Sequence, residues 1–115
     1  MKIGIIGAGK VGCSIGKYLT EHGFSVAGYC SKSKKSVEEA ATFTNTKAYD
    51  SLAELVAEST ILFLTTPDGA LESVWNELKK ESIQNKIVCH FSGSLSSDLF
   101  SNREEYGVSA ASFHP

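Results

Sequence analysis

Short apolar runs alternate with amphipathic segments along the whole chain. Runs rich in Ile, Val, Leu and Phe have the length of buried strands. These predicted strands cover residues 3–6, 25–30, 47–49, 60–65, 86–91 and 108–113. Between the strands, apolar residues recur at the spacing of an amphipathic helix. The predicted helices cover residues 10–22, 36–43, a segment that starts at 52, 71–78 and 96–102.

Local signals set the expected helix boundaries. Ser36-x-x-Glu39 and Ser51-x-x-Glu54 are capping boxes, which predict the starts of the second and third helices. Gly23 predicts the end of the first helix. Four side chains of the first helix are expected to face the sheet: Val11, Ile15, Tyr18 and Leu19.

The first strand runs directly into a G-x-G-x-x-G pattern, and the first helix follows at once. In this strand–turn–helix context the pattern predicts a dinucleotide site. The first glycine permits the tight turn, the second lets a pyrophosphate approach the backbone, and the third lets the helix lie close to the sheet. The helix N-terminus then offers N–H groups and partial positive charge to the phosphates. The alternative is a glycine-rich turn without a ligand. The expected cofactor contacts in this loop are Gly7, Ala8, Gly9, Lys10, Val11 and Gly12.

Strands that alternate with helices pair in parallel and are covered by helices on both faces. With the glycine pattern after the first strand, six strands predict an α/β fold: a doubly wound Rossmann sheet of order 3-2-1-4-5-6, in three αβα layers. Ligands bind such a sheet at the carboxyl ends of the strands, between the first and fourth strands. The residues that follow each strand are therefore the candidates for the site.

Composition narrows the class of protein. A chain of 115 residues with a net charge of −2 is expected to form one domain, without the basic surface that binds nucleic acid. No apolar run approaches the roughly 20 residues of a membrane-spanning helix, so no membrane partner is expected. Cys13, Cys30 and Cys89 form no Cys-x-x-Cys pair, which argues against a disulfide framework or a metal site. These features indicate a reducing, cytoplasmic setting.

A polar, basic segment follows the second strand. NAD sites usually place Asp or Glu here to bind the ribose 2′-hydroxyl, but this chain has Ser31-Lys32-Ser33 and then Lys35. A carboxylate would repel a 2′-phosphate, whereas lysine and serine neutralise it and donate hydrogen bonds to it. These four residues are therefore the expected contacts of an NADP(H) cofactor, in preference to NAD(H). The alternative is a solvated loop with no ligand.

Thr65-Thr66-Pro67 follows the fourth strand and is expected to lie along the ribose and the nicotinamide side of the cofactor. Pro67 ends the strand and fixes a turn before the next helix. Asp68 is placed to cap that helix. Capping by a side chain is compatible with cofactor contact by the neighbouring backbone.

Two further strand ends carry candidate catalytic residues. Ser92-Gly93 follows the fifth strand, where Ser92 would bind a carboxamide or a substrate carbonyl; alternatively, it starts the next helix. His114 follows the sixth strand, and a histidine there suits the proton transfer that accompanies hydride transfer; alternatively, it is a loop residue. His90 lies further inside the fifth strand and is expected to be a hydrogen-bonded core residue.

Several of these motifs together resemble one family. The glycine pattern, Ser31-Lys32-Ser33, Thr66-Pro67-Asp68, His90-x-Ser92-Gly93 and Ser112-Phe113-His114-Pro115 are similar to the N-terminal Rossmann-like domain of a family of oxidoreductases. In that family the second half is a helical domain of unknown function (the DUF2520 type). Its relatives are the F420-dependent NADP oxidoreductases, pyrroline-5-carboxylate reductases and β-hydroxyacid dehydrogenases.

The resemblance covers essentially the whole chain. It implies NADP(H) binding, a reductase or dehydrogenase activity on a small-molecule substrate, and a helical domain, expected outside these 115 residues, that closes the site and forms a homodimer. His114-Pro115 also resembles the motif of prephenate dehydrogenases, whose histidine assists hydride transfer, and this implies the same role for His114. Such families commonly have arginine at the position of Lys32. Lysine keeps the charge but loses the planar, bidentate grip on phosphate.

Two functions remain open at this point. The first is the cofactor-binding half of an NADP-dependent oxidoreductase, which by itself is expected to bind cofactor without turning over substrate. The second is a stand-alone module that senses a nucleotide and performs no chemistry. A methyltransferase that uses S-adenosylmethionine is disfavoured, because the segment after the second strand has no acid to hold the ribose hydroxyls.

Overall fold

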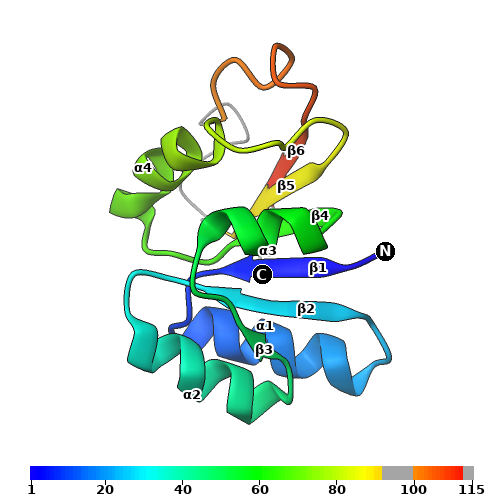
Figure 1. The fold of residues 1–115 in the computed structure, drawn as a ribbon, viewed down its shortest axis with the longest axis vertical. Helices are drawn as coiled ribbons and strands as arrows, with labels where there is room; N and C mark the ends of the chain where they lie inside the picture. The colour runs from blue at the N-terminus through cyan, green and yellow to red at the C-terminus, as the bar shows by residue number, and fades with distance from the viewer. Residues whose placement is uncertain (92–99, 113–115) are drawn as a thin grey trace.

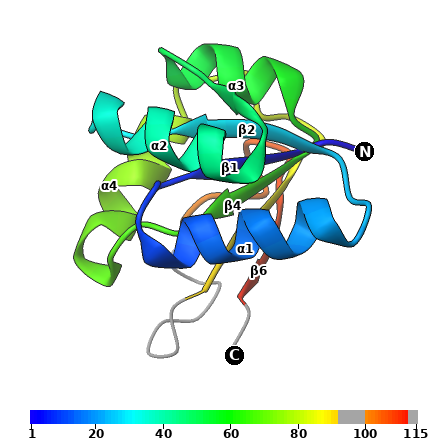
Figure 2. The ribbon, with the colours of Figure 1, turned by 90° about the horizontal axis from the view of Figure 1, so that it is seen from below.

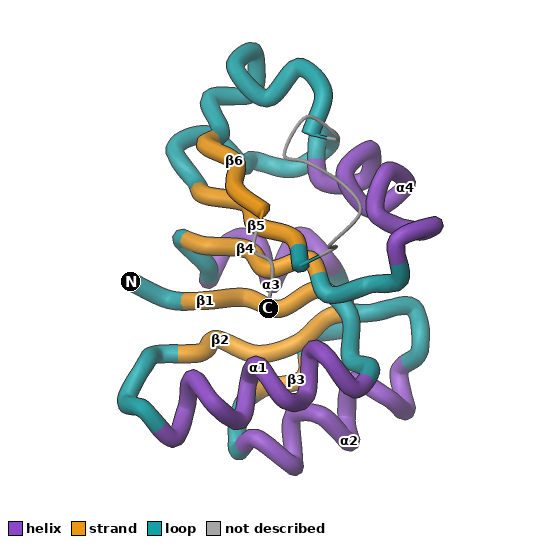
Figure 3. The backbone as a smooth tube through the Cα atoms, turned by 180° about the vertical axis from the view of Figure 1, so that it is seen from behind, coloured by secondary structure: helices purple, strands orange, loops and turns teal. Residues whose placement is uncertain are grey.

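The strands form one six-stranded, all-parallel sheet of order β3-β2-β1-β4-β5-β6, which confirms the predicted fold class. The computed structural model describes residues 1–91 and 100–112. Figure 3 shows the strands stacked in this order. The strands are β1 (Ile3–Ile6), β2 (Val26–Cys30), β3 (Lys47–Ala48), β4 (Ile61–Leu64), β5 (Ile87–His90) and β6 (Ser109–Ser112).

In the described residues, four helices cover the two faces of the sheet, which gives three layers. Helices α1 and α2 share one apolar cluster with the sheet, and α3 and α4 share the other (Figure 1). Figure 2 shows α1 and α3 on opposite sides of β1 and β4. The helices are α1 (Lys10–Glu21), α2 (Lys34–Thr44), α3 (Leu52–Glu58) and α4 (Asp68–Leu78). In the described part of the chain, none of the helices has both the length and the apolar character needed to cross a membrane.

The larger apolar cluster lies between the sheet and α4. Trp75 of α4 is fully buried, as its place on the apolar stripe predicts, and its ring packs edge-on against Phe100 at 5.3 Å between centroids. Its indole N–H donates to the Ser101 carbonyl at 2.9 Å. His90 is also fully buried and lies 5.5 Å from the Phe100 ring, so its predicted burial is confirmed.

Helix α1 presents a different face to the sheet from the one predicted. Val11 and Tyr18 are 51% and 59% exposed, so the expectation that they face the sheet is wrong. Gly12 and Gly16 are the buried residues of the helix. A glycine stripe lets a helix approach a sheet more closely than any side chain does, and a pattern built on apolar residues does not register it. Cys13 and Leu19 pack partly buried beside that stripe.

One predicted capping box forms and the other does not. Ser51 caps α3, because its hydroxyl accepts from the Glu54 N–H at 3.2 Å and donates to the Glu54 carboxylate at 3.0 Å. The expected box at Ser36 is wrong: α2 starts one turn earlier, with Ser33 as its N-cap. The Ser36 N–H donates to the Ser33 hydroxyl at 3.3 Å. An available serine three residues upstream satisfies the helix donors first and extends the helix.

The start of α4 and the helix predicted over residues 96–102 also need comment. The N-cap of α4 is Pro67, and Asp68 is the first residue of the helix rather than its cap. An acid in the first turn still interacts favourably with the helix dipole. The helix predicted over residues 96–102 falls mostly outside the described residues, and residues 100–102 form a bend and turns.

The stability of the fold is expected to fall at high pH. All three cysteines are free thiols. Burial raises the pKa of Cys89 from 9.0 to about 11 and the pKa of Tyr29 from 10.0 to about 12. In the unfolded chain both groups ionise at their ordinary values, so unfolding releases protons above about pH 9. The free energy of unfolding should then fall by up to about 1.4 kcal/mol per pH unit for each group.

Denaturant titrations at pH 8, 10 and 11 should show this fall in the free energy of unfolding. The Cys89→Ala variant should show a shallower fall between pH 9 and 11. Equal pH dependence in both proteins would contradict the assignment.

A methyl group at Gly16 should destabilise the protein, although alanine is the better helix former. A Cβ there would overlap the Tyr29 hydroxyl and come within 2.9 Å of Tyr29 Cζ. We expect Gly16→Ala to lower the free energy of unfolding by about 1–3 kcal/mol, the range for overpacked cores. Gly69→Ala is the matched control in α4, because nothing lies within 4 Å of its added Cβ; it should stabilise by up to about 1 kcal/mol. Urea denaturation measures both, and equal effects of the two changes would show that the packing of α1 is looser than described.

Candidate functional site

The glycine loop between β1 and α1 has the geometry that each of its glycines was predicted to supply. Gly7 has a φ of +107°, a conformation that L side chains rarely adopt. A Cβ on Gly12 would overlap the Gly7 carbonyl and come within 2.7 Å of Thr65 Oγ1, so the helix touches the loop and the end of β4. A Cβ on Gly9 would meet nothing within 4 Å, so space lies open above that residue.

The carbonyl groups of this loop accept hydrogen bonds from the end of β4 and from the first turn of α1. Thr65 Oγ1 donates to the Gly7 carbonyl at 3.0 Å, the Cys13 thiol to the Ala8 carbonyl at 3.6 Å, and the Cys13 N–H to the Gly9 carbonyl at 2.9 Å. The first N–H groups of α1, from Lys10 onward, have no carbonyl partner within a helix. An N-terminus with its donors free and its dipole positive is suited to bind an anion.

A cleft of about 420 Å³ lies over this loop and will be called the glycine-loop cleft. It brings the β1–α1 loop together with the ends of β2 and β4. Most of the predicted cofactor contacts line it, and Gly12 lies just beneath them. The lining residues are Gly7, Ala8, Gly9, Lys10, Val11, Ser31, Ser36, Leu64, Thr65, Thr66, Pro67, Asp68 and Phe91.

A second cleft of about 430 Å³ lies beside the first and will be called the α4 cleft. The two clefts share Ser31, Thr66 and Pro67. Lys32 and Glu77 line the α4 cleft together with apolar side chains that include Ile6, Leu52 and Val74. A mostly apolar cleft with a lysine in its lining can take a ring and an attached anionic group.

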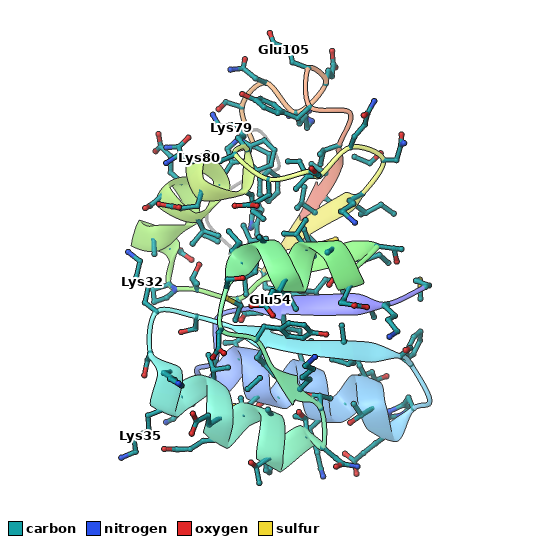
Figure 4. The ribbon with its side chains drawn as sticks, in the orientation of Figure 1. Lys32, Lys35, Glu54, Lys79, Lys80 and Glu105 are labelled. Carbon is teal, nitrogen blue, oxygen red and sulfur yellow. The ribbon has the colours of Figure 1, made fainter. Side chains whose placement is uncertain are left out.

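The basic segment after β2 is split by the structure. Lys32 lies where β2 ends, whereas Lys35 projects from α2 away from α4 (Figure 4). Lys35 lines a separate surface depression with Glu38 and Glu39. The structure therefore brings Lys32 to the α4 cleft and leaves Lys35 outside both clefts.

Ser36 lines the glycine-loop cleft, whereas the sequence predicted that it caps a helix. Its hydroxyl accepts from the Ser33 hydroxyl at 3.0 Å, and Ser33 also caps α2. The side chain of Ser33 is thus engaged in the helix start, while Ser36 reaches the glycine-loop cleft. Ser36 could have been predicted if Ser33 had been recognised as the N-cap of α2. An N-cap at residue 33 places residue 36 in the first turn of the helix, beside the loop.

The Thr66 hydroxyl is the exceptional polar group of the site. Its Oγ1 is buried and has no hydrogen-bond partner among the described residues. A buried hydroxyl without a partner costs roughly 1–3 kcal/mol of desolvation. Because Thr66 lines both clefts, a ligand that occupies them could supply the missing partner.

Three predicted site residues, Ser92, Gly93 and His114, lie outside the described residues. Phe91, which precedes them, lines the glycine-loop cleft and packs edge-on against Phe63 at 5.1 Å. Over residues 1–91 and 100–112, no group of three or more His, Cys, Asp or Glu side chains could hold a metal ion.

Solved structures with this fold include several oxidoreductases. The imine reductase from Myxococcus stipitatus in complex with NADP⁺ matches with a TM-score of 0.82 at 16% identity, over 99% of this chain and 40% of that chain. Its V8 variant in complex with NAD⁺ matches at 0.78 and 19%, over 98% and 38%. UDP-N-acetylglucosamine 3-dehydrogenase GnnA from Acidithiobacillus ferrooxidans matches at 0.78 and 19%, over 97% and 37%. The chain spans about two-fifths of the length of each of these structures.

At such identities the likeness shows the fold. No curated protein matches the sequence. The Rossmann-like domain model matches residues 1–115, and the chain therefore belongs to the Rossmann-like domain family.

Proposed function

We propose that this chain binds NADP(H) across the two clefts as the cofactor domain of an oxidoreductase. The observation that carries the proposal is Thr66, whose buried hydroxyl has no partner among the described residues and which lines both clefts, one of them together with the start of α1. The open space above Gly9 also fits a ligand that approaches the backbone closely. The structural neighbours support this function, because they include a dehydrogenase and imine reductases in complex with NADP⁺ and NAD⁺.

Each part of the cofactor has residues suited to hold it. The N–H groups at the start of α1 would bind the pyrophosphate. The apolar side of the α4 cleft, with Leu52 and Val74, would hold the adenine ring. Thr66 and Pro67 would contact the ribose and nicotinamide half, and Phe91 would border the nicotinamide end of the cleft.

The preference for NADP(H) over NAD(H) rests on this chain's own residues, since the neighbours include complexes with both cofactors. Lys32 is exposed at the end of β2, and no acid stands at the positions from Ser31 to Ser36. A 2′-phosphate there would gain a charge-assisted hydrogen bond from the lysine. Ser31 and Ser36, which line the glycine-loop cleft, would donate further hydrogen bonds.

The bound cofactor would supply or accept a hydride, and the chain's own residues bind and orient it. Ser92 and His114 keep their sequence-based roles in this proposal, Ser92 as a contact for a carbonyl and His114 as a proton donor or acceptor. A helical domain would close the site over a small-molecule substrate and pair two subunits, in a cytoplasmic protein that does not act on nucleic acid. A module without chemistry is not favoured, because the structural neighbours are oxidoreductases.

Reversal of the charge at Lys32 should change the cofactor preference. Lys32→Glu places a carboxylate against the 2′-phosphate, so the Kd for NADPH should rise about tenfold or more, the size expected for a lost charged hydrogen bond. The Kd for NADH should stay within about twofold. Calorimetric titration of each variant with both cofactors measures the two constants.

Lys35→Glu is the matched control, because it makes the same charge change on α2 at a side chain that lines a different depression. It should leave both constants close to those of the unaltered protein. Equal weakening of NADPH and NADH by Lys32→Glu, or equal effects of the two variants on NADPH, would refute the assigned role of Lys32.

Replacement of Thr66 by valine should separate stability from binding. Thr66→Val keeps the shape of the side chain and removes the unpartnered hydroxyl, so the free energy of unfolding without cofactor should rise by about 1 kcal/mol. Binding of NADPH should weaken about three- to tenfold, because the hydroxyl's partner in the complex is lost. Thermal unfolding with and without NADPH tests both signs at once. A stabilised variant that binds NADPH normally would remove Thr66 from the site.

A further inference from the structure

Tyr29 is a buried polar side chain that the cofactor contacts do not use. It lies in β2 beneath α1 and has no exposed surface. Its hydroxyl donates to the Gly12 carbonyl at 2.8 Å, in the first turn of α1. The ring fits there because Gly16 has no side chain, since a Cβ on Gly16 would overlap the hydroxyl.

A continuous line of hydrogen bonds runs from this hydroxyl to the glycine loop. The Gly12 carbonyl and the Cys13 N–H belong to the same peptide unit. The Cys13 N–H donates to the Gly9 carbonyl at 2.9 Å. The Gly9 carbonyl in turn shares its peptide unit with the Lys10 N–H, the first N–H of α1. Two hydrogen bonds and two peptide units therefore connect Tyr29 with the N–H of Lys10, a residue that lines the glycine-loop cleft.

Such a line has two physical effects. Successive hydrogen bonds polarise one another, by roughly 10–30% per bond, so the Tyr29 bond makes the Cys13 N–H a better donor to Gly9. The fixed Gly9 carbonyl also sets the plane of the Gly9–Lys10 peptide and thus the direction of the Lys10 N–H. A donor that is already aimed pays less ordering entropy when an anion binds.

The Tyr29 hydroxyl can serve as a donor over the whole physiological pH range. Burial raises the pKa of Tyr29 to about 12. Packing alone does not require the hydroxyl, because phenylalanine would fill nearly the same volume.

We propose that Tyr29 is a positioning residue that aims the first N–H groups of α1 at the pyrophosphate of the cofactor, acting through Gly12, Cys13 and Gly9. The inference rests on the proposed function for its ligand. The orientation of the loop in the protein without cofactor does not depend on that function.

Tyr29→Phe tests the role. The Kd for NADPH should rise about three- to tenfold, the effect of one buried hydrogen bond. The Kd for adenosine 2′-monophosphate, which lacks the pyrophosphate, should stay unchanged. Amide hydrogen exchange at Cys13 should become several-fold faster in the protein without any ligand. Thr44→Val is the control, because it removes a buried hydroxyl at the end of α2 that donates to the Ala40 carbonyl and leaves the bond between Tyr29 and Gly12 intact; it should change neither the NADPH Kd nor the Cys13 exchange.

The outcomes separate this inference from the proposed function. Failure of the unaltered protein to bind NADPH would contradict the proposed function, while exchange at Cys13 would still report on Tyr29. Normal NADPH binding and normal exchange in Tyr29→Phe would overturn the positioning role. Equal weakening of NADPH and adenosine 2′-monophosphate would also overturn it, since that result marks a general structural defect.

Discussion

The close approach of α1 to the ends of β1 and β4 is the constraint on which the site depends. Gly12 touches the Gly7 carbonyl and Thr65, and no side chain fits between them. This contact places the N-terminus of α1 directly beside the end of β4. The glycine-loop cleft follows from it, because the β1–α1 loop and the β4–α4 loop both line that cleft, and the α4 cleft shares Thr66 and Pro67 of the second loop.

The site combines carbonyl groups that accept hydrogen bonds from the protein with polar groups that lack such a partner among the described residues. The carbonyls of Gly7, Ala8 and Gly9 are held by Thr65 and Cys13. The N–H groups at the start of α1 have no carbonyl partner within the helix, and the Thr66 hydroxyl has no partner among residues 1–91 and 100–112. A surface of this kind is preorganised for an anion, since the protein has already met the cost of orienting its donors.

The sequence was sufficient to predict the strand order, the helical layers, the tight turn at Gly7 and the close packing at Gly12. These features follow from the local spacing of glycines and apolar residues, and the tertiary packing of the protein does not override that pattern. Val11 and Tyr18 were wrongly predicted to lie on the packing face of α1, because Gly12 and Gly16 contribute no apolar signal although they make the contact. Ser36 was missed as a cleft residue because its hydroxyl was assigned to a cap that Ser33 supplies instead.

Other features had no sequence signal at all. Nothing in a strand that reads Val-Ala-Gly-Tyr-Cys pairs its tyrosine with the carbonyl of Gly12, 17 residues away. The same holds for Thr66, whose missing partner is a property of the folded surroundings. Lys32 and Lys35 look equivalent in the sequence, and only the start of α2 at residue 34 turns them in different directions.

The most direct test of the central claim is a calorimetric titration of the unaltered protein with NADPH and with NADH. The account predicts that NADPH binds at a single site and more tightly than NADH by about tenfold or more, as expected for one charged contact with the 2′-phosphate. Absence of binding by either cofactor would contradict the claim that these clefts form a dinucleotide site, and tighter binding of NADH would contradict the role given to the end of β2.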